Sequence, residues 1–262
     1  MISVCMATYN GEKFVYEQIC SILSQLSEED ELIISDDNST DSTCSIIKSF
    51  ADKRIVLYEN VVNEGVVKNF EYALSKAKGD YIFLSDQDDV WLSDKVFLSI
   101  SKFQELEKVN SNSPLLVFAD MSVTDQKLNT IYPSFFKEKN HNLSLSPTIP
   151  ILSVANRLPG NTLAFNRKAL EVSLPIEDFA IMHDWWIACA VVASGGVVGV
   201  VDKPLVYYRQ HTDNVLGALA KKEKSLSFSQ KICYNFRIFR MTRHFFGISF
   251  FRYILNKIRL HL

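Results

Sequence analysis

Residues 79–91 read GDYIFLSDQDDVW, a short apolar run that leads directly into a cluster of carboxylates. The run at 81–84 is typical of a buried β-strand, because it is compact, rich in aromatic and aliphatic side chains, and bounded by polar turns. Outward from it, similar runs alternate with longer segments whose apolar residues recur at the helical spacing of three and four. The predicted strands are 2–7, 31–35, 55–58, 81–84 and 115–119, and the predicted helices are 14–26, 43–50, 66–77 and 93–109.

Regular alternation of strand and helix predicts parallel strands joined by right-handed crossovers. The expected fold class is α/β, with a doubly wound, mostly parallel central sheet and flanking helices. Ligands of such sheets bind outside the carboxyl ends of the strands. Polar residues stand at this point after four of the predicted strands: Thr8, Asp36 with Asp37, the segment 86–89, and Asp120.

The pattern weakens after residue 125. We expect a long loop over 132–156, a strand at 161–166, a helix at 184–193, and two strands at 196–201 and 205–209. The predicted domain spans 1–215, with one half at about 1–120 and a second at about 121–215. A basic helical tail would occupy 216–262, and a homodimer is left open.

Composition narrows the functional classes. A chain of 262 residues that is 47% hydrophobic can fill one substantial core. Five scattered cysteines without a C-x-x-C pair argue against a disulfide framework and a zinc knuckle. We see no secretory signal pattern and no apolar run of the ~20 residues that span a bilayer. The sequence therefore predicts a cytoplasmic protein.

Charge is distributed unevenly along the chain. Residues 221–262 hold ten Lys and Arg against one Glu, which gives +9 and, from the total of -2, leaves -11 on residues 1–220. An acidic body argues against nucleic acid as a partner. The Phe-rich basic tail predicts an amphipathic helix on an anionic membrane surface, at the inner face of the cell membrane. A helix that packs on the body or on a partner chain is the alternative.

Asp86, Asp88 and Asp89 place three carboxylates within four residues, which is costly unless a cation neutralises them. Hard oxygen ligands favour Mg²⁺ or Mn²⁺, and these ions share their coordination with substrate phosphates. The cluster therefore predicts a phosphorylated ligand. The alternative is a solvated turn in which Asp89 or Ser93 caps the next helix.

The segment 36–41 reads DDNSTD and follows the second predicted strand. Its last residues can cap the next helix, and capping is the preferred role of Asp41. That role does not require both Asp36 and Asp37. A carboxylate at a strand end can accept a hydrogen bond from the imide N–H of a pyrimidine base, and Thr8 is expected beside it.

Five segments together resemble family-two glycosyltransferases of the GT-A fold. They are 3–10 (SVCMATYN), 34–41 (ISDDNSTD), 63–65 (NEG), 79–89 (GDYIFLSDQDD) and 183–186 (HDWW), in the order that the family shows. The resemblance spans residues 1 to about 211. The family more often has Ser where this chain has Gln87, and an acidic residue where it has His183.

The resemblance implies a nucleotide site with a metal. It makes the half at about 1–120 the nucleotide-binding half and the half at about 121–215 the acceptor-binding half. Thr8, Tyr9 and Asp37 correspond to residues that hold the base, Asp86 to one near the ribose or the metal, and Asp88 to the metal ligand under the diphosphate. Mn²⁺ or Mg²⁺ would act as a Lewis acid toward the leaving nucleoside diphosphate. Three more residues are assigned to the nucleotide site: Ala7, Lys68 and Gln87.

The resemblance places the general base of an inverting transfer at Asp184. Trp185 and Trp186 would offer aromatic faces to a sugar; the alternative is a helix cap followed by core tryptophans. In the segment 208–211 (YRQH), Arg209 would supply positive charge at the diphosphate and His211 a further metal ligand. For His211, a purely local hydrogen-bonding role is the alternative. Two residues are assigned to the acceptor side: Gly160 and Asn161.

Together these residues predict an inverting, metal-dependent enzyme that moves a single sugar from a nucleoside-diphosphate sugar to a saccharide or lipid-linked acceptor in bacterial surface-polysaccharide synthesis. The strings DQDDVW, HDWW and YRQH look most like those of rhamnosyltransferases, which favours dTDP-rhamnose. UDP-galactose, UDP-glucose and a UDP-N-acetylhexosamine stay open as donors. A non-catalytic nucleotide-sugar-binding subunit of a membrane assembly is the alternative from another class. An oxidoreductase is disfavoured, because residues 8–11 lack the Gly-x-Gly-x-x-Gly turn.

Overall fold

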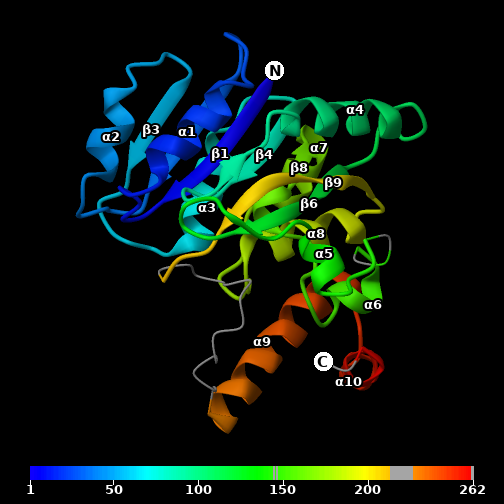
Figure 1. Cartoon of the computed structure of the whole chain (residues 1–262). Helices are drawn as coiled ribbons and strands as arrows, with labels where there is room; N and C mark the ends of the chain where they lie inside the picture. The colour runs from blue at the N-terminus through cyan, green and yellow to red at the C-terminus, as the bar shows by residue number, and fades with distance from the viewer. Residues whose placement is uncertain (144, 146, 213–226, 261–262) are drawn as a thin grey trace.

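The computed structural model describes residues 1–143, 145, 147–212 and 227–260, and Figure 1 shows how their elements are arranged. The first part of the chain alternates strands and helices as predicted. Its strands pair in parallel in the order β3-β2-β1-β4. The elements are β1 (Ile2–Thr8), α1 (Val15–Leu23), β2 (Glu31–Asp36), α2 (Thr43–Ser49), β3 (Ile55–Glu59), α3 (Val66–Lys76) and β4 (Tyr81–Ser85).

The second part of the chain extends the same sheet. The strand order over the described residues is β3-β2-β1-β4-β8-β6-β9-β5, with β7 paired to β6. Strand β8 lies antiparallel between β4 and β6, so the sheet is mixed at a place where parallel neighbours were expected. The elements are β5 (Val90–Trp91), α4 (Lys95–Glu107), β6 (Leu115–Thr124), β7 (Thr130–Tyr132), β8 (Ala164–Asn166), α7 (Arg167–Ser173), α8 (His183–Ala193) and β9 (Val197–Arg209).

The structure corrects several predicted boundaries. The predicted loop at 132–156 contains two short helices, α5 (Phe135–Glu138) and α6 (Ile149–Leu152). The predicted strand at 161–166 begins as a 3₁₀ turn, η1 (Gly160–Thr162), before β8. The two strands predicted after residue 195 are the single strand β9.

Asp120 does not follow a strand, because it lies inside β6. Its Oδ2 accepts the hydroxyl of Ser134 (2.5 Å), and its Oδ1 accepts the N–H of Phe136 (3.2 Å). Asp120 therefore anchors the start of α5 and does not join the residues at the carboxyl ends of β1, β2 and β4.

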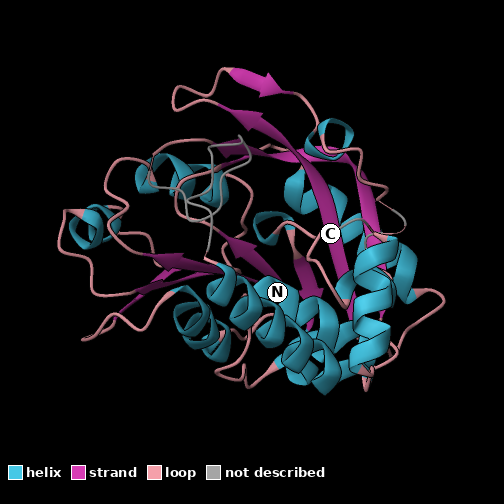
Figure 2. Cartoon of the chain, turned by 90° about the horizontal axis from the view of Figure 1, so that it is seen from below, coloured by secondary structure: helices cyan, strands magenta, loops and turns pink. Residues whose placement is uncertain are grey.

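Both faces of the sheet are buried under helices (Figure 2). Val4 and Met6 of β1 belong to the core with α1 and α4, whereas Cys5 belongs to the core with α3 and α8. Successive side chains of a strand point to opposite faces. A strand that is covered on both sides is therefore apolar throughout, which explains the unbroken apolar runs in the sequence.

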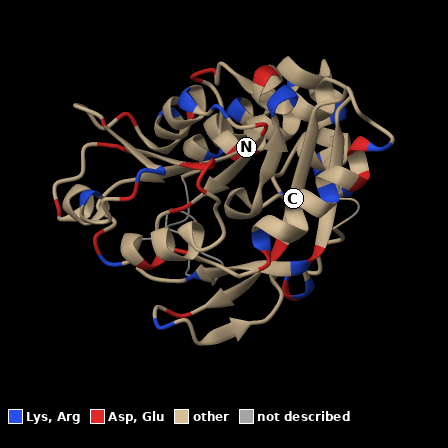
Figure 3. Ribbon diagram, turned by 90° about the horizontal axis from the view of Figure 1, so that it is seen from above, with Lys and Arg blue, Asp and Glu red and all other residues tan. Residues whose placement is uncertain are grey.

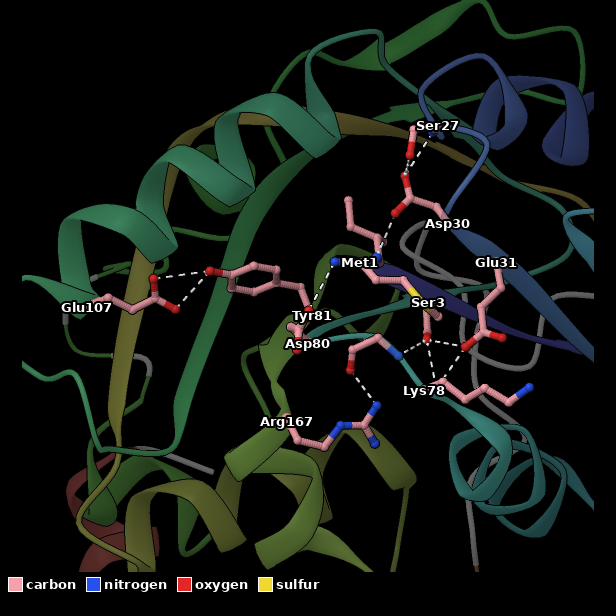
Figure 4. A network of polar contacts seen from close by, with 12 residues as sticks. Met1, Ser3, Ser27, Asp30, Glu31, Lys78, Asp80, Tyr81, Glu107 and Arg167 are labelled. Atoms are coloured by element: carbon pink, nitrogen blue, oxygen red, sulfur yellow. Dashed lines mark hydrogen bonds and ion pairs between the residues drawn. The ribbon is translucent and has the colours of Figure 1, made fainter.

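The amino ends of the strands are tied together at one edge of the sheet (Figure 4). The hydroxyl of Ser3 donates to Glu31 (2.6 Å) and accepts the N–H of Gly79 (2.7 Å). Arg167 donates to the main-chain oxygen of Gly79. These contacts join β1, β2 and the start of β4, and so fix the register in which their carboxyl ends meet at the opposite edge.

The predicted tail helix is two helices. The first, α9 (Phe228–Phe246), ends at Gly247 in the left-handed conformation with φ 59°, and α10 (Phe250–Arg259) follows. The predictions for Lys221, Lys222 and Lys224 lie outside the described residues. No described helix has both the length and the apolar composition that crossing a membrane requires.

Candidate active site

The carboxyl ends of β1, β2 and β4 bring three predicted segments to one edge of the sheet. Thr8 stands opposite Asp36 in the parallel register, and Met6 stands opposite Ser85. The segments that follow these residues therefore leave the sheet side by side. This is the position at which open α/β sheets bind their ligands.

The acidic loop 86–89 lies close to Asp184 of α8. Burial raises the pKa of Asp86 to about 7, and the negative charges of Asp88 and Asp184 contribute to that rise. Burial and the neighbouring carboxylates also raise the pKa of Asp89 well above its usual value. The η1 turn joins the loop and Asp184: its Asn161 donates to Asp89 of the loop (2.6 Å), and a Cβ atom added at its Gly160 would lie 2.9 Å from Oδ2 of Asp184. The fold thus places Asp184 beside a loop that lies far from it in the sequence.

Asp89 is fully buried and links the acidic loop to the second half of the sheet. Its carboxylate accepts the side-chain N–H of Asn161 (2.6 Å) and the main-chain N–H of Arg209 (3.1 Å). Neither Asp89 nor Ser93 caps α4, whose N-cap residue is Asp94. Asn161 is 4% exposed and its side chain is taken up by Asp89, so its predicted place on the acceptor side stays a prediction. Asp89 and Asn161 are structural partners.

Lys95 is a buried cation that sequence reasoning missed. Its ammonium donates to the main-chain oxygen of Asn161 (2.6 Å) and lies 3.9 Å from the ring centre of Trp91. Burial lowers the pKa of Lys95 to about 7, against the opposing effect of Asp89 and Asp86. The sequence did carry a signal, because Lys95 shares the four-residue spacing of the buried Ser99 and Phe103.

The end of β9 reaches the acidic loop through two side chains. Arg209 is 3% exposed; it donates to the main-chain oxygen of Asp88 (2.9 Å) and pairs with Glu17 of α1 (2.5 Å). The Nε2 atom of His211 lies 2.7 Å from Oδ2 of Asp88, and the His211 ring packs on Phe14. The sequence prediction grouped Arg209 and His211 with the acidic loop, and the geometry brings them there. The sequence prediction did not include Glu17.

Asp88 and His211 fit a divalent cation. A carboxylate oxygen and an imidazole nitrogen that converge in this way are ligands that Mn²⁺ accepts, and such ions complete their coordination with water and phosphate. Within the described ranges, no group of three or more His, Cys, Asp or Glu side chains gathers as metal ligands do. The pair therefore suits a metal that is held jointly by the protein and a diphosphate. The prediction that Asp86 is also a metal ligand rests only on its place in the acidic loop.

Asp184 lies in the first turn of α8 and is 8% exposed. Burial raises its pKa to about 6, although hydrogen bonds from the N–H groups of Trp185 and Gly160 and from the side chain of Asn156 oppose the rise. A Cβ atom added at Gly160 would lie 2.9 Å from Oδ2 of Asp184, so only glycine leaves room for this carboxylate. Gly160 supports Asp184 directly.

Trp185 and Trp186 belong to the core, which contradicts their predicted role as platforms for a sugar. Their exposed fractions are 4% and 3%, and their indole N–H groups donate to the main-chain oxygens of Leu152 and Ser173. The Trp186 ring is covered by aromatic side chains of α9. Both side chains are therefore occupied within the fold.

His183 precedes Asp184 and is also buried. Its ring stacks on Phe70 of α3 at a centroid distance of 3.8 Å, and neither ring nitrogen has a hydrogen-bond partner among the described residues. Burial lowers the pKa of His183 to about 3, so the imidazole is neutral. His183 therefore does not supply the negative charge that the family usually has at this position.

Thr8 and Asp37, the residues predicted to hold the base, also organise their own edge of the sheet. The hydroxyl of Thr8 donates to Asp36 (2.7 Å). The two oxygens of Asp37 accept the N–H groups of Glu64 (2.9 Å) and Gly65 (2.8 Å). A carboxylate has further acceptor positions beyond these two, so recognition of a base by Asp37 stays a prediction.

Four more residues were predicted to bind the nucleotide or its base. The amide of Gln87 pairs with the main chain of Tyr9, whose side chain is 47% exposed. Ala7 is half-buried near the end of β1. The ammonium of Lys68 contacts Glu71 (2.9 Å) and Asp178 (3.0 Å), which accounts for its position without a nucleotide.

Comparisons with known proteins bear on the family of the chain and on its fold. The chain is 29% identical to "dTDP-rhamnosyl transferase RfbG" of Shigella flexneri, over 81% of this chain and 74% of that protein. It is 39% identical to "UDP-Glc:alpha-D-GlcNAc-diphosphoundecaprenol beta-1,3-glucosyltransferase WfaP" of Escherichia coli, over 42% of this chain and 43% of that protein.

Among solved structures, TarS of S. aureus in complex with UDP-GlcNAc matches with a TM-score of 0.62 and 20% identity, covering 81% of this chain and 59% of that one. The match confirms the predicted GT-A type of fold. The matches cover less than two thirds of the length of WfaP and of the TarS chain. The family model for "Glycosyl transferase family 2" matches residues 3–159. That match covers more than half of the chain, and the protein therefore belongs to glycosyl transferase family 2.

Proposed function

We propose that this protein transfers a single sugar from a nucleoside-diphosphate sugar to an acceptor hydroxyl, with inversion at the anomeric carbon. The observation that supports the proposal most is the link that η1 makes between Asp184 and the acidic loop: Gly160 packs against the Asp184 carboxylate, and the neighbouring Asn161 donates to Asp89 (2.6 Å). Asp184 is a buried carboxyl whose pKa is raised to about 6. A general base works best when its pKa lies near the working pH. The base and the candidate diphosphate site thus share one edge of the sheet.

The proposed reaction is a single displacement. The carboxylate of Asp184 takes the proton of the acceptor hydroxyl while that oxygen forms a bond to the anomeric carbon. The bond from the anomeric carbon to the diphosphate breaks, and the electron pair leaves with the nucleoside diphosphate. A bound Mn²⁺ or Mg²⁺, held by Asp88 and His211, would offset the charge on the diphosphate. The buried guanidinium of Arg209 holds the main chain of Asp88 in place for this role.

For the donor, we propose dTDP-rhamnose as the first candidate, supported by the similarity to RfbG over most of the chain. UDP-glucose is the second, supported by the higher identity to WfaP over a shorter stretch. UDP-galactose and UDP-N-acetylhexosamines complete the set to be tested. The proposed acceptor is a saccharide or lipid-linked saccharide of bacterial surface-polysaccharide synthesis.

A donor panel tests this proposal. The purified chain is incubated with each nucleotide-sugar, Mn²⁺ and a membrane lipid extract, and free nucleoside diphosphate is measured. We expect release from one donor that EDTA abolishes. A chain that binds UDP or dTDP with Mn²⁺ but turns over no donor would instead be the non-catalytic subunit, in which Asp184→Asn has no effect beyond folding.

We further propose that α9 and α10 contact the cytoplasmic face of the membrane. Residues 227–260 carry seven Lys and Arg and no Asp or Glu, whereas acidic and basic residues are interspersed over the body (Figure 3). In α10, Phe250, Ile254 and Ile258 are exposed at four-residue intervals, beside Phe251 at 73%. Tyr253, on another side of the same helix, is buried, and its ring packs near Phe239 of α9. An exposed apolar stripe among cations suits an anionic lipid surface.

The membrane proposal has a matched control within the chain. Phe251→Glu should weaken cosedimentation with vesicles of phosphatidylglycerol and phosphatidylcholine by about tenfold, because it replaces an inserted ring with a charge. Phe97→Glu changes an equally exposed phenylalanine on α4, at 71%, and should leave vesicle binding unchanged. If both variants lose vesicle binding equally, or if neither loses it, then α10 does not bind the membrane.

A further inference from the structure

The side-chain amide of Gln87 makes a reciprocal pair of hydrogen bonds with Tyr9. The N–H of Tyr9 donates to Oε1 of Gln87 (2.9 Å), and Nε2 of Gln87 donates to the main-chain oxygen of Tyr9 (2.9 Å). Both bonds have the length of an ordinary amide hydrogen bond. Tyr9 follows β1, and Gln87 lies between Asp86 and Asp88 after β4. The pair therefore joins two loops that come from separate strands.

The loop that carries Tyr9 is already fastened to the loop after β2. The N–H of Asn10 donates to the hydroxyl of Ser39 (2.8 Å), and Oδ1 of Asn10 accepts the N–H of Thr40 (2.9 Å). The N–H of Gly11 donates to the hydroxyl of Thr43 (2.8 Å). Gln87 adds the acidic loop to this assembly, so that the loops after β1, β2 and β4 are held as one unit.

Gly11 provides the space that the Gln87 amide occupies. A Cβ atom added at Gly11 would lie 2.2 Å from Oε1 and 2.5 Å from Cδ of Gln87, closer than real atoms approach. The backbone of Gly11 is not in the left-handed region, so alanine fits the chain itself at this position. A methyl group there would simply displace the end of the Gln87 side chain. Gly11 and Gln87 are therefore complementary.

We propose that Gln87 is a positioning residue for the donor: its amide fixes the main chain of Tyr9 relative to Asp88, and so sets the distance between the exposed Tyr9 ring and the candidate metal ligand. A nucleoside diphosphate has to span that distance between its base and its phosphates. The proposal rests on the proposed function, and it moves Gln87 from the predicted nucleotide contacts to a role exerted through Tyr9. A serine at this position is too short to make both bonds.

A double-mutant cycle on Gln87→Ala and Gly11→Ala tests the proposal. Each single variant should raise the donor KM, and the Kd of the free nucleoside diphosphate with Mn²⁺, by about tenfold, because two hydrogen bonds of ordinary strength are lost. Neither change touches Asp184, so kcat should stay within about twofold. The double variant should match the single ones, because the added methyl group has nothing left to displace once residue 87 is alanine.

Thermal unfolding of the four proteins supplies a second readout. Failure of Gly11→Ala to fold alone, with recovery in the double variant, would support the same contact. Independent effects that multiply to about a hundredfold, or a Gln87→Ala protein with unchanged donor KM, would overturn the proposal. A wild-type chain that binds no nucleoside diphosphate would refute the proposed function instead, so the two failures are distinguishable.

Discussion

Replacing Asp184 by Asn separates a catalytic base from a structural residue, because the two roles predict opposite changes in stability. The exchange keeps the size of the side chain, removes its charge and its ability to accept a proton, and replaces one acceptor oxygen by an NH₂ donor. If Asp184 is the base, kcat should fall by about 10²- to 10⁴-fold. The same exchange should leave the folded protein as stable as before or more stable.

The change in stability follows from the burial of Asp184. Its folded pKa, about 6, lies above the usual value of 3.8, so the unfolded chain releases this proton first and stability falls as the pH rises from about 4 to 6. Above that range the cost of holding the ionised carboxylate corresponds to about 3 kcal/mol. The Asp184→Asn protein avoids that cost. It loses about 1 kcal/mol of stability in return, because the new NH₂ group faces an N–H donor with which it cannot form a hydrogen bond. The expected net gain is about 2 kcal/mol, or a Tm higher by about 4–8 °C.

The assay measures nucleoside diphosphate release at pH 7.5 and thermal unfolding at pH 7.5 and pH 4. At pH 4 Asp184 is protonated in the folded state, so the gain in Tm should disappear there. Asp202→Asn, at an exposed position, is the control and should change neither quantity. A variant that is less stable than wild type at pH 7.5 and retains its kcat would refute the reasoning and make Asp184 a structural residue.

Three further predictions follow from the same contacts. The kcat of the wild type, measured at saturating donor and Mn²⁺, should fall about tenfold per pH unit below 6, because the base must be ionised; a constant kcat down to pH 5 would contradict this. Asp88→Ala should weaken Mn²⁺ binding, measured by electron paramagnetic resonance, by at least about tenfold, and unchanged affinity would place the metal elsewhere. Asn161→Ala should destabilise the protein by about 2–3 kcal/mol in urea unfolding, because it removes a partner of the buried Asp89. Asn129→Ala removes the same kind of bond at the surface, to Asp125, and should cost less than about 1 kcal/mol.

Much of the first half of the fold could be predicted, because strands covered on both faces leave unbroken apolar runs and their helices keep a clear period. The strand predicted at 161–166 contains β8, but its start was placed too early, because the chain first makes the 3₁₀ turn η1. Its antiparallel pairing with β4 and β6 was not predicted, because a three-residue strand carries no pattern that gives its direction. The segment predicted as two strands, 196–201 and 205–209, is the single strand β9, although it contains Pro204, which cannot donate to a β-ladder. In the structure Pro204 falls where the pairing of β6 with β9 shifts register, and the strand continues past it.

The candidate site, too, could be predicted in part from the sequence. The acidic residues that follow β2 and β4 were found by a general rule about where open sheets bind ligands, whereas Asp184, in α8, was assigned by the family resemblance. Lys95 and Glu17 were missed because their partners, Asn161 and Arg209, come from distant parts of the chain. The two tryptophans were assigned wrongly although α8 has no polar side after Asp184, and a helix that is apolar all round is a buried helix.

The central claim, a single displacement with Asp184 as the base, is tested most directly by the anomeric configuration of the product. The glycoside formed from the donor that the panel identifies is isolated after early turnover, and its anomeric proton and carbon are assigned by NMR. A single displacement predicts a configuration opposite to that of the donor. A product that retains the donor's configuration would contradict the account.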